Sequence, residues 1–374
     1  MNGIQNPSHT GATSGERQAD EALQSRLLDG VSRTFALTIP QLPNDLYPVV
    51  ANAYLLCRIV DTIEDETSLS PEQKRQFCSA FVEVVKYGAD ATQFSQNLTP
   101  LLSTQTIPAE HELVKQIPPI IKITRSFSDI QISALSGCVE TMANGMPQFQ
   151  AQGLDKGLPT MDEMDRYCYY VAGCVGEMLA KLFCEYSSEI APNEAVLMNL
   201  SVSFGQGLQM TNILKDIWDD LDRGVCWLPQ DIFDEYGYDL AKLSPDQDSE
   251  AFKAGLEHLI EIAHFHLANA LSFTLLIPKH ETGIRNFCLW ALGMAVLTLK
   301  KIKENLNFNN SNQVKISRYS VKATVLCSRL CGSHDGLLKL LFNWCGRGLS
   351  ISQFHKISKI QHNKFVSEIH HSKG

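Results

Sequence analysis

Apolar residues recur at helical spacing along most of this chain, and this periodicity decides the fold class. One helical face, for example, is made by Val49, Ala53, Leu56, Val60 and Ile63. No convincing run alternates apolar and polar residues as a half-buried strand would, and no βαβ unit is recognisable. The sequence therefore predicts an all-α fold.

Charge is distributed unevenly along the 374 residues, of which 44% are hydrophobic and 20% charged. Residues 300–374 carry 13 Lys and Arg against 3 Asp and Glu, although the whole chain has a net charge of −9. The main body is therefore acidic, which argues against nucleic acid as a partner. The basic C-terminal stretch fits the phosphates of a nucleotide, a diphosphate or an anionic membrane surface, or simply a solvated face.

Eleven cysteines are scattered without CxxC spacing, several of them inside apolar helical runs such as those around Cys57, Cys174 and Cys184. This usage is typical of reduced, buried thiols in an intracellular protein. Residues 1–20 are polar and lack the apolar core of a signal peptide, so we expect a disordered tail. The strongest apolar run, residues 287–299, is too short to span a bilayer. We expect a cytoplasmic protein, with peripheral membrane contact as an option.

Capping and breaking residues predict where the helices begin and end. One helix is expected to be capped by Asn44 or Asp45, and the next to start at Ser70-Pro71. A later helix should end at Arg223-Gly224, and another should run from Ser244-Pro245 to about residue 273. Residues 285–306 should form a further helix, followed by a loop over residues 307–313.

A further helix, which contains residues 167–183 and two internal glycines, is predicted with Thr160 and Glu163 as its capping box. Gly173 and Gly176 each cost about 1 kcal/mol relative to Ala in a helix interior. Something must therefore approach this backbone closely, either a neighbouring helix or an apolar ligand in a groove.

Two acidic clusters lie far apart in the sequence, each within a helix-patterned segment. The two sets that each share one helical face are Asp61, Glu64 and Asp65, and Asn212, Asp216 and Asp220. Oxygen ligands on two facing helices can bind several Mg²⁺ ions and leave the remaining ligand positions to phosphate and water. The pairing predicts a site for magnesium diphosphate.

Cations lie close to both clusters in the sequence. Arg58, Lys215 and the pair Ser32-Arg33 are candidates for contacts to phosphate oxygens. Such contacts and the metal ions would together neutralise a diphosphate as its bond to carbon breaks.

Aromatic residues could line an apolar cavity beside these clusters. Tyr54, Tyr167 and Phe287 would then stabilise a carbocation and keep it away from water, although each of them also fits an ordinary core position. His264 and His266 are interpreted as ordinary helix residues, since no partner follows at ligand spacing.

Nucleotide-binding and hydrolase motifs are not found. The stretch Gly205-Gln206-Gly207 lacks a third glycine and lies in a helical pattern, so it does not predict a dinucleotide-binding loop. No Walker loop and no serine nucleophile elbow is present.

Four segments in combination resemble the squalene and phytoene synthase family. They are residues 32–35, 54–66, 167–176, and 209–220 with 227–230, and the resemblance covers roughly residues 25–330. It implies the isoprenoid synthase fold, a single-domain helical bundle around a large central cavity. We expect this catalytic domain over residues 21–330, followed by a basic C-terminal helix and tail over residues 331–374.

The resemblance also implies an activity, the head-to-head joining of two prenyl diphosphates. Members that form squalene couple two farnesyl diphosphates to presqualene diphosphate and then rearrange and reduce it with NADPH. Members that form phytoene or dehydrosqualene end by proton loss. Residues 285–288 and 314–318 are similar to the squalene-forming branch and favour it. A chain-elongating enzyme is disfavoured because paired Asp-Asp-x-x-Asp boxes are absent, and a non-catalytic helical assembly protein is a distant alternative.

Residue roles follow from the same resemblance. Tyr167 would handle a proton or stabilise a cation in the first half, Phe287 would face the cation in the second, and Arg58 and Tyr54 would lie at the reacting groups. The residues expected to bind NADPH phosphates are Lys315, Arg33, Arg58, Lys215 and Arg318. Those expected to bind substrate are Ser32, Arg33, Val171, Gly173, Gln209 and Asn212.

The sequence departs from the family pattern at three places. Lys215 stands where an arginine is expected, which keeps the charge but loses bidentate geometry. Ser317 also stands where an arginine is expected, and the arginine is displaced to Arg318. Residues 337–342 replace a longer hydrophobic anchor, and they fit either an interfacial helix or a packed terminal helix.

Overall fold

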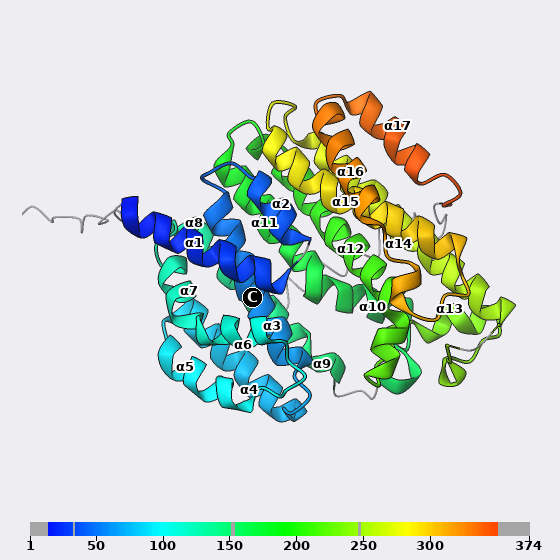
Figure 1. Cartoon of the computed structure of the whole chain (residues 1–374), viewed down its shortest axis with the longest axis horizontal. Helices are drawn as coiled ribbons and strands as arrows, with labels where there is room; N and C mark the ends of the chain where they lie inside the picture. The colour runs from blue at the N-terminus through cyan, green and yellow to red at the C-terminus, as the bar shows by residue number, and fades with distance from the viewer. Residues whose placement is uncertain (1–13, 33, 151–153, 246–247, 351–374) are drawn as a thin grey trace, which may run out of the picture.

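The computed structural model describes residues 14–32, 34–150, 154–245 and 248–350. Within these ranges the chain is a bundle of helices without a β-strand, and Leu158 and Pro229 form a single isolated bridge. The all-α prediction is confirmed (Figure 1). The α-helices are α1 Ser14–Val31, α2 Phe35–Thr38, α3 Tyr47–Asp65, α4 Pro71–Val82, α5 Ala91–Leu98, α6 Pro108–Lys115, α7 Ile117–Thr124, α8 Asp129–Gly145, α9 Pro147–Gln150, α10 Met161–Cys168, α11 Cys174–Tyr186, α12 Glu194–Asp222, α13 Gln230–Glu235, α14 Glu250–Leu276, α15 Thr282–Glu304, α16 Arg318–Cys331 and α17 Asp335–Cys345. Two π segments are η2 Glu83–Tyr87 and η5 Tyr169–Gly173, and the short 3-10 turns are η1 Ile39–Gln41, η3 Thr99–Leu101, η4 Leu154–Lys156, η6 Ala191–Asn193, η7 Leu240–Lys242 and η8 Ser311–Gln313.

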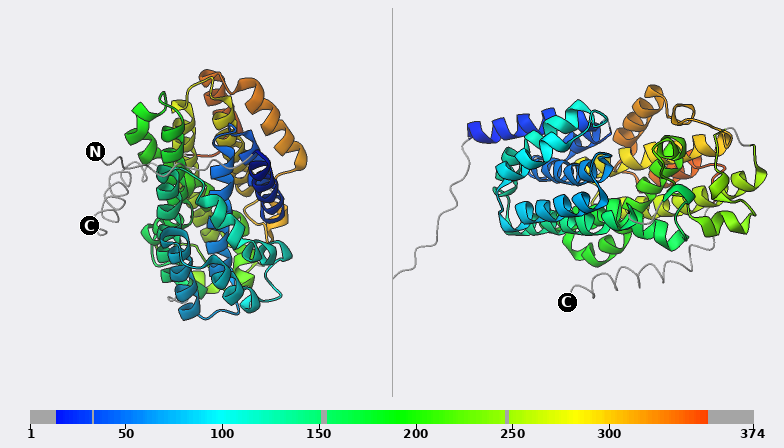
Figure 2. Two further views of the ribbon diagram at one scale, coloured as in Figure 1. Left: turned by 90° about the vertical axis from the view of Figure 1, so that its left-hand side faces the viewer. Right: turned by 90° about the horizontal axis from the view of Figure 1, so that it is seen from below.

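The longest helix, α12, lies in the middle of the bundle and packs against α11, α14 and α15. Helices α4 to α7 gather at one end of the molecule and α13 at the other, while α16 and α17 lie on the outer side of α15 (Figures 1 and 2). This arrangement brings α3 and α12, the two helices with acidic clusters, to the same interior region.

The start of α3 corrects one prediction and confirms another. Its N-cap position is Leu46, without a side-chain cap, so the predicted cap at Asn44 or Asp45 is wrong. Pro48 in the first turn supplies the helical backbone angle without needing a donor. The predicted apolar face is confirmed, because every one of its five residues is buried.

Of three other predicted helix starts or tails, one is confirmed and two are wrong. Ser70 caps α4 in a full capping box with Gln73, as its sequence indicates. The predicted start of α14 at Ser244-Pro245 is wrong, because Ser249 is the cap and accepts a hydrogen bond from the Phe252 amide. Helix α1 begins at Ser14, so residues 14–20 are helical and the tail prediction is wrong there. The buried side chains of Leu27 and Leu28 attach this helix to the core. Residues 1–13 lie outside the described residues.

The predicted helix over residues 167–183 is interrupted by the π segment η5 between α10 and α11. Thr160 caps α10, but the Glu163 side chain pairs with Arg166 and does not complete a capping box. A Cβ atom added at Gly176 would lie 2.1 Å from the carbonyl oxygen of Ser201 on α12. The close neighbour at Gly176 is therefore the backbone of a helix, the first of the two alternatives, and the nearest atoms at Gly173 are side-chain atoms of Tyr169 and Val202.

Helices α14 and α15 are long and apolar enough to cross a membrane by length and composition. Both are mostly buried inside the bundle, as the core helices of a folded protein are, so their apolar character is weak evidence for a membrane span. The C-terminal residues 351–374 lie outside the described residues.

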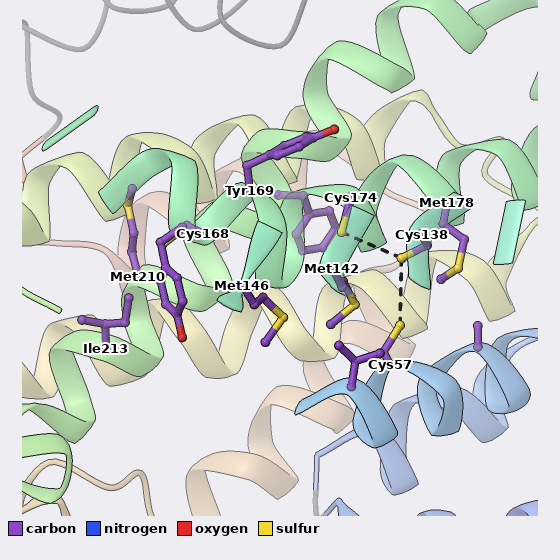
Figure 3. Packing of buried hydrophobic residues seen from close by; sticks show 14 of the residues in the cluster. Cys57, Cys138, Met142, Met146, Cys168, Tyr169, Cys174, Met178, Met210 and Ile213 are labelled. Atoms are coloured by element: carbon purple, nitrogen blue, oxygen red, sulfur yellow. Dashed lines mark hydrogen bonds between the residues drawn. The ribbon is translucent and has the colours of Figure 1, made fainter. Parts of the chain in front are cut away.

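Sulfur atoms from three helices meet in the core (Figure 3). The Cys138 sulfur on α8 lies 3.9 Å from that of Cys57 on α3 and 3.9 Å from that of Cys174 on α11. All eleven cysteines are described, and all are free thiols. The thiols thus serve as small apolar groups that pack α8 against α3 and against α11.

Candidate active site

One continuous cavity lies between α3 and α12, and it has two compartments of opposite character. The apolar compartment measures about 290 Å³ and the polar compartment about 560 Å³. Five residues line both and mark the junction: Arg58, Asp61, Val171, Gln209 and Asn212. A molecule with a charged head and a hydrocarbon chain would therefore find surroundings of the matching kind on either side of this junction.

The polar compartment contains both acidic clusters. Its acidic and amide lining residues are Asp61, Glu64 and Asp65 from α3, and Gln209, Asn212, Asp216 and Asp220 from α12. The negative charge of Asp65 contributes to raising the pKa of Asp220, so the two clusters are close enough to interact electrostatically. All six residues that the sequence predicts as the magnesium site therefore line the same compartment.

Burial changes the acidity of this compartment. It raises the pKa of Asp61 to about 7; Arg58 opposes this rise, and Asp65 adds to it. Burial also raises the pKa of Asp220 to about 6, against the opposing effect of Arg223. Near neutral pH these carboxyl groups would be stabilised by additional positive charge.

Cations are interleaved with the carboxylates. The Lys215 ammonium lies 2.9 Å from Asp216, and Arg223 donates to Asp220. Lys74 on α4 donates to the main-chain carbonyl of Glu64, at the end of the first cluster. Lys74 and Arg223 both line the polar compartment, but sequence reasoning missed them as site residues. Lys74 lies on a different helix from either cluster, so no periodic signal identified it, whereas the spacing of three residues from Asp220 could have identified Arg223.

The guanidinium of Arg58 lies between two carboxylates. It donates to Glu110 on α6, and its Nη1 lies 3.8 Å from an oxygen of Asp61. Glu110 was also missed, because α6 is separated in sequence from both clusters. The contact ties α6 to the junction of the two compartments.

The donor set of the polar compartment fits Mg²⁺, which prefers hard oxygen ligands. No group of three His, Cys, Asp or Glu side chains in the described part of the chain is assembled closely enough to hold an ion alone. This agrees with the usual binding of Mg²⁺ through one or two carboxylates together with water and substrate phosphates. The metal-binding roles of the two clusters stay a prediction.

Tyr167 is buried beside the first cluster. Its ring stacks on Trp227 at 3.7 Å between centroids, with 11° between the planes, and both residues line the polar compartment. Burial, followed by the charges of Glu64 and Asp65, raises the pKa of Tyr167 well above its usual value. The phenol therefore keeps its proton and is available as a hydrogen-bond donor.

The π segment η5 places Val171 at the junction of the two compartments, because Val171 lines both. Such π segments within helices frequently occur at functional sites. Gly173 in the same segment lines neither compartment, and a Cβ there would meet Val202 of α12 at 3.2 Å. The prediction that Gly173 contacts substrate therefore has no support in the geometry.

The apolar compartment is formed mainly by aliphatic and aromatic side chains from seven α-helices and from the short segments η1 and η5. Tyr54 and Phe287 both line it, as predicted from the sequence, and Phe35 lies 5.0 Å from the Tyr54 ring. The other aromatic lining residues are Phe183, Phe204 and Phe273. Ser32 hydrogen bonds to Tyr54 and accepts from the Phe35 amide, which places it behind this lining.

The residues expected to bind NADPH are not all brought to this cavity. Lys315 and Arg318 line neither compartment, and the Lys315 ammonium donates to Asn312 at 2.8 Å. Ser317 caps α16 through the Ser320 amide and thus has a structural role. Arg33 lies outside the described residues. The cofactor roles of these residues stay predictions.

Comparisons with known proteins agree with this geometry. The sequence model described as "Squalene/phytoene synthase" matches residues 28–320. A squalene synthase of Gibberella zeae is 29% identical over 297 residues, which cover 78% of this chain and 61% of the relative. A squalene synthase of Eremothecium gossypii is 31% identical over 318 residues, which cover 81% of this chain and 67% of the relative. The chain thus spans about two-thirds or less of the length of these relatives.

A solved ligand complex of TcSQS has a similar fold. It superposes with a TM-score of 0.70 at 23% identity, covering 92% of this chain and 95% of that chain. At 23% sequence identity, this similarity establishes the fold alone.

Proposed function

Because the chain belongs to the squalene/phytoene synthase family, we propose that it is a squalene synthase that couples two farnesyl diphosphates to presqualene diphosphate and reduces this with NADPH. The observation that supports this most directly is the junction between the two compartments. Asp61, Gln209 and Asn212 line both, so a diphosphate among the acidic clusters would have its hydrocarbon chain in the apolar compartment.

Ionisation of the diphosphate is the first chemical requirement. Mg²⁺ bound by the two clusters would neutralise the leaving group without proton transfer. Arg58, Lys74, Lys215 and Arg223 line the polar compartment and lie beside carboxylates or a carbonyl of the site. In our proposal these cations exchange part of their carboxylate contacts for phosphate oxygens when substrate binds, which adds charge-assisted hydrogen bonds.

The carbocation that remains needs a dry, aromatic environment. Phe287 and Tyr54 line the apolar compartment, where a ring face can stabilise positive charge. Tyr167 is buried and protonated, which suits it to donate a hydrogen bond to the departing diphosphate or to direct a proton in the first half. Phe287 is proposed to face the cation of the second half.

Reduction in the second half requires NADPH beside the same cavity. We assign its phosphates to Lys315, Arg318 and Lys215, together with Arg33 and Arg58, as the family resemblance implies. The basic excess after residue 300 supports phosphate binding in this part of the chain.

A second candidate is a dehydrosqualene or phytoene synthase, which needs no reductant. The position of Lys315 and Arg318 outside both compartments favours it. Product analysis separates the candidates: the purified chain is incubated with farnesyl diphosphate and Mg²⁺, with and without NADPH. Squalene formed only with NADPH is expected. A dehydrogenated product as the main outcome in both incubations would contradict the reductive step.

For location we propose a cytoplasmic enzyme in peripheral contact with a membrane. Eleven free thiols, most of them buried, are typical of a reducing compartment. The hydrocarbon substrate and product of the proposed reaction also favour membrane contact.

A further inference from the structure

The hairpin formed by α16 and α17 exposes six large apolar side chains. Three lie on α16 and three on α17: Tyr319, Leu326, Leu330, Leu337, Leu340 and Trp344. The spacings of seven and four on α16, and of three and four on α17, return each row to one helical face. These six residues are called the hairpin patch. The other large exposed apolar residues of the described chain are distributed over the remaining helices and loops.

A groove of about 250 Å³ runs between the two helices of the hairpin and α15. Tyr319 and Trp344 of the hairpin patch lie along it, and Leu289 and Leu292 of α15 are part of its lining. The opposite side of α15 carries Phe287, which lines the apolar compartment. Helix α15 therefore separates the interior cavity from the exposed groove.

Basic residues predominate in the segment that carries the hairpin patch. Residues 315–347 contain six Lys and Arg but one acidic residue, Asp335. Asp335 is already paired with Arg285, and its other oxygen lies 3.5 Å from Lys279. Lys322 and Lys339 are exposed on the hairpin itself. This local excess contrasts with the net charge of −9 for the whole chain.

We propose that the hairpin patch is a docking surface for an anionic lipid membrane. Exposed leucines would enter the boundary between headgroups and acyl chains, Trp344 and Tyr319 would lie at headgroup level, and the lysines would contact anionic headgroups. A second copy of the chain fits less well, because two identical patches would bring positive charge against positive charge. None of the six residues lines the two compartments of the proposed active site, so this surface is separate from the proposed reaction, although it rests on the membrane contact proposed above for the chain.

The test is co-sedimentation of the full chain with vesicles of phosphatidylcholine, with and without phosphatidylglycerol. We expect binding to the anionic vesicles that weakens with salt, and little binding to phosphatidylcholine alone. The double variant Leu340→Ser/Trp344→Ser should lower the affinity for anionic vesicles about tenfold or more, and Lys322→Glu/Lys339→Glu should do the same.

Matched controls come from other exposed positions. Ile130→Ser/Val196→Ser removes two exposed apolar side chains elsewhere, and Lys115→Glu/Lys122→Glu reverses two exposed charges elsewhere. Both should bind vesicles as the unmodified chain does. The proposal is overturned if the unmodified chain stays in the supernatant with anionic vesicles, or if the control pairs lose as much affinity as the patch pairs. A dimer in solution that only the patch substitutions dissociate would assign the surface to a second copy instead.

Discussion

Glu110 on α6 accepts a charged hydrogen bond from Arg58 on α3, and this ion pair holds the guanidinium at the junction of the two compartments. Burial alone would lower the pKa of Arg58, but Asp61 and Glu110 together raise it, so the side chain stays charged. The position of a cation beside the proposed diphosphate site is therefore set by a carboxylate that lines neither compartment.

Glu110→Gln is expected to lower kcat/KM for farnesyl diphosphate by about 10- to 100-fold, because a hydrogen bond to a charged group contributes roughly 1.5–3 kcal/mol. Steady-state kinetics measures the effect. Glu112→Gln is the matched control, since Glu112 lies on the same helix and pairs with Arg26 at the surface. Equal kinetics for the two variants would show that Glu110 has no positioning role.

Asp61→Asn and Asp216→Asn should each reduce Mg²⁺-dependent turnover about 100- to 1,000-fold, because each removes charge from the proposed metal site. The melting temperature of Asp61→Asn without metal should not fall, since burial penalises the charged form of Asp61. Asp219→Asn, an exposed neighbour on α12, should retain activity. Near-normal turnover by a folded Asp61→Asn or Asp216→Asn variant would refute the metal-site assignment.

Stability and Mg²⁺ binding should respond to pH in opposite directions. Burial raises the folded-state pKa of Asp61 to about 7, above the value of about 3.9 in the unfolded chain. The folded state therefore binds more protons between these values, and the contribution of Asp61 to the free energy of unfolding decreases as pH rises from about 4 to 7.

Mg²⁺ requires the ionised carboxylate, so stabilisation by Mg²⁺ with inorganic diphosphate should increase as pH rises from about 5.5 to 7.5. Thermal unfolding at fixed ligand concentration measures this increase. In Asp61→Asn the increase should be smaller. A stabilisation that is independent of pH in the unmodified chain would exclude Asp61 as a ligand.

Close packing of α12 against η5 should tolerate no extra methyl group. Gly205→Ala would place a Cβ 2.1 Å from the carbonyl oxygen of Ala172, and we expect a loss of about 1–3 kcal/mol in the free energy of unfolding. Gly137→Ala on α8 has nothing within 4 Å of the added Cβ, so it should be neutral or stabilising by up to about 1 kcal/mol. Urea unfolding measures both changes, and the packing argument fails if the two variants have the same stability.

Local periodicity was sufficient to predict the helical class, the buried face of α3 and the two acidic faces. Tyr54 was placed by the same spacing, whereas Tyr167 and Phe287 were proposed as aromatic residues and given roles by the family resemblance; all three line the cavity. These features depend on spacing within one helix, and spacing is visible in a sequence.

Contacts between helices that are distant in sequence could not be predicted in this way. Glu110 and Lys74 reach the site from α6 and α4, and their sequence neighbourhoods resemble those of ordinary surface helices. The start of α14 at Ser249 and not at Ser244 was missed because both serines are acceptable caps, and tertiary packing selects one of them.

Helix α12 is continuous over 29 residues and lines the apolar compartment at Phe204 and the polar one at Asp220. At 1.5 Å per residue these two positions are about 24 Å apart along a rigid axis. Substitutions on α12 can change the side chains that line the two compartments, but they cannot change the distance along the helix between the apolar and the polar compartment. Selection for substrates of another chain length would therefore have to act through the size of the side chains that line the apolar compartment, such as Phe183, Phe204 and Phe287.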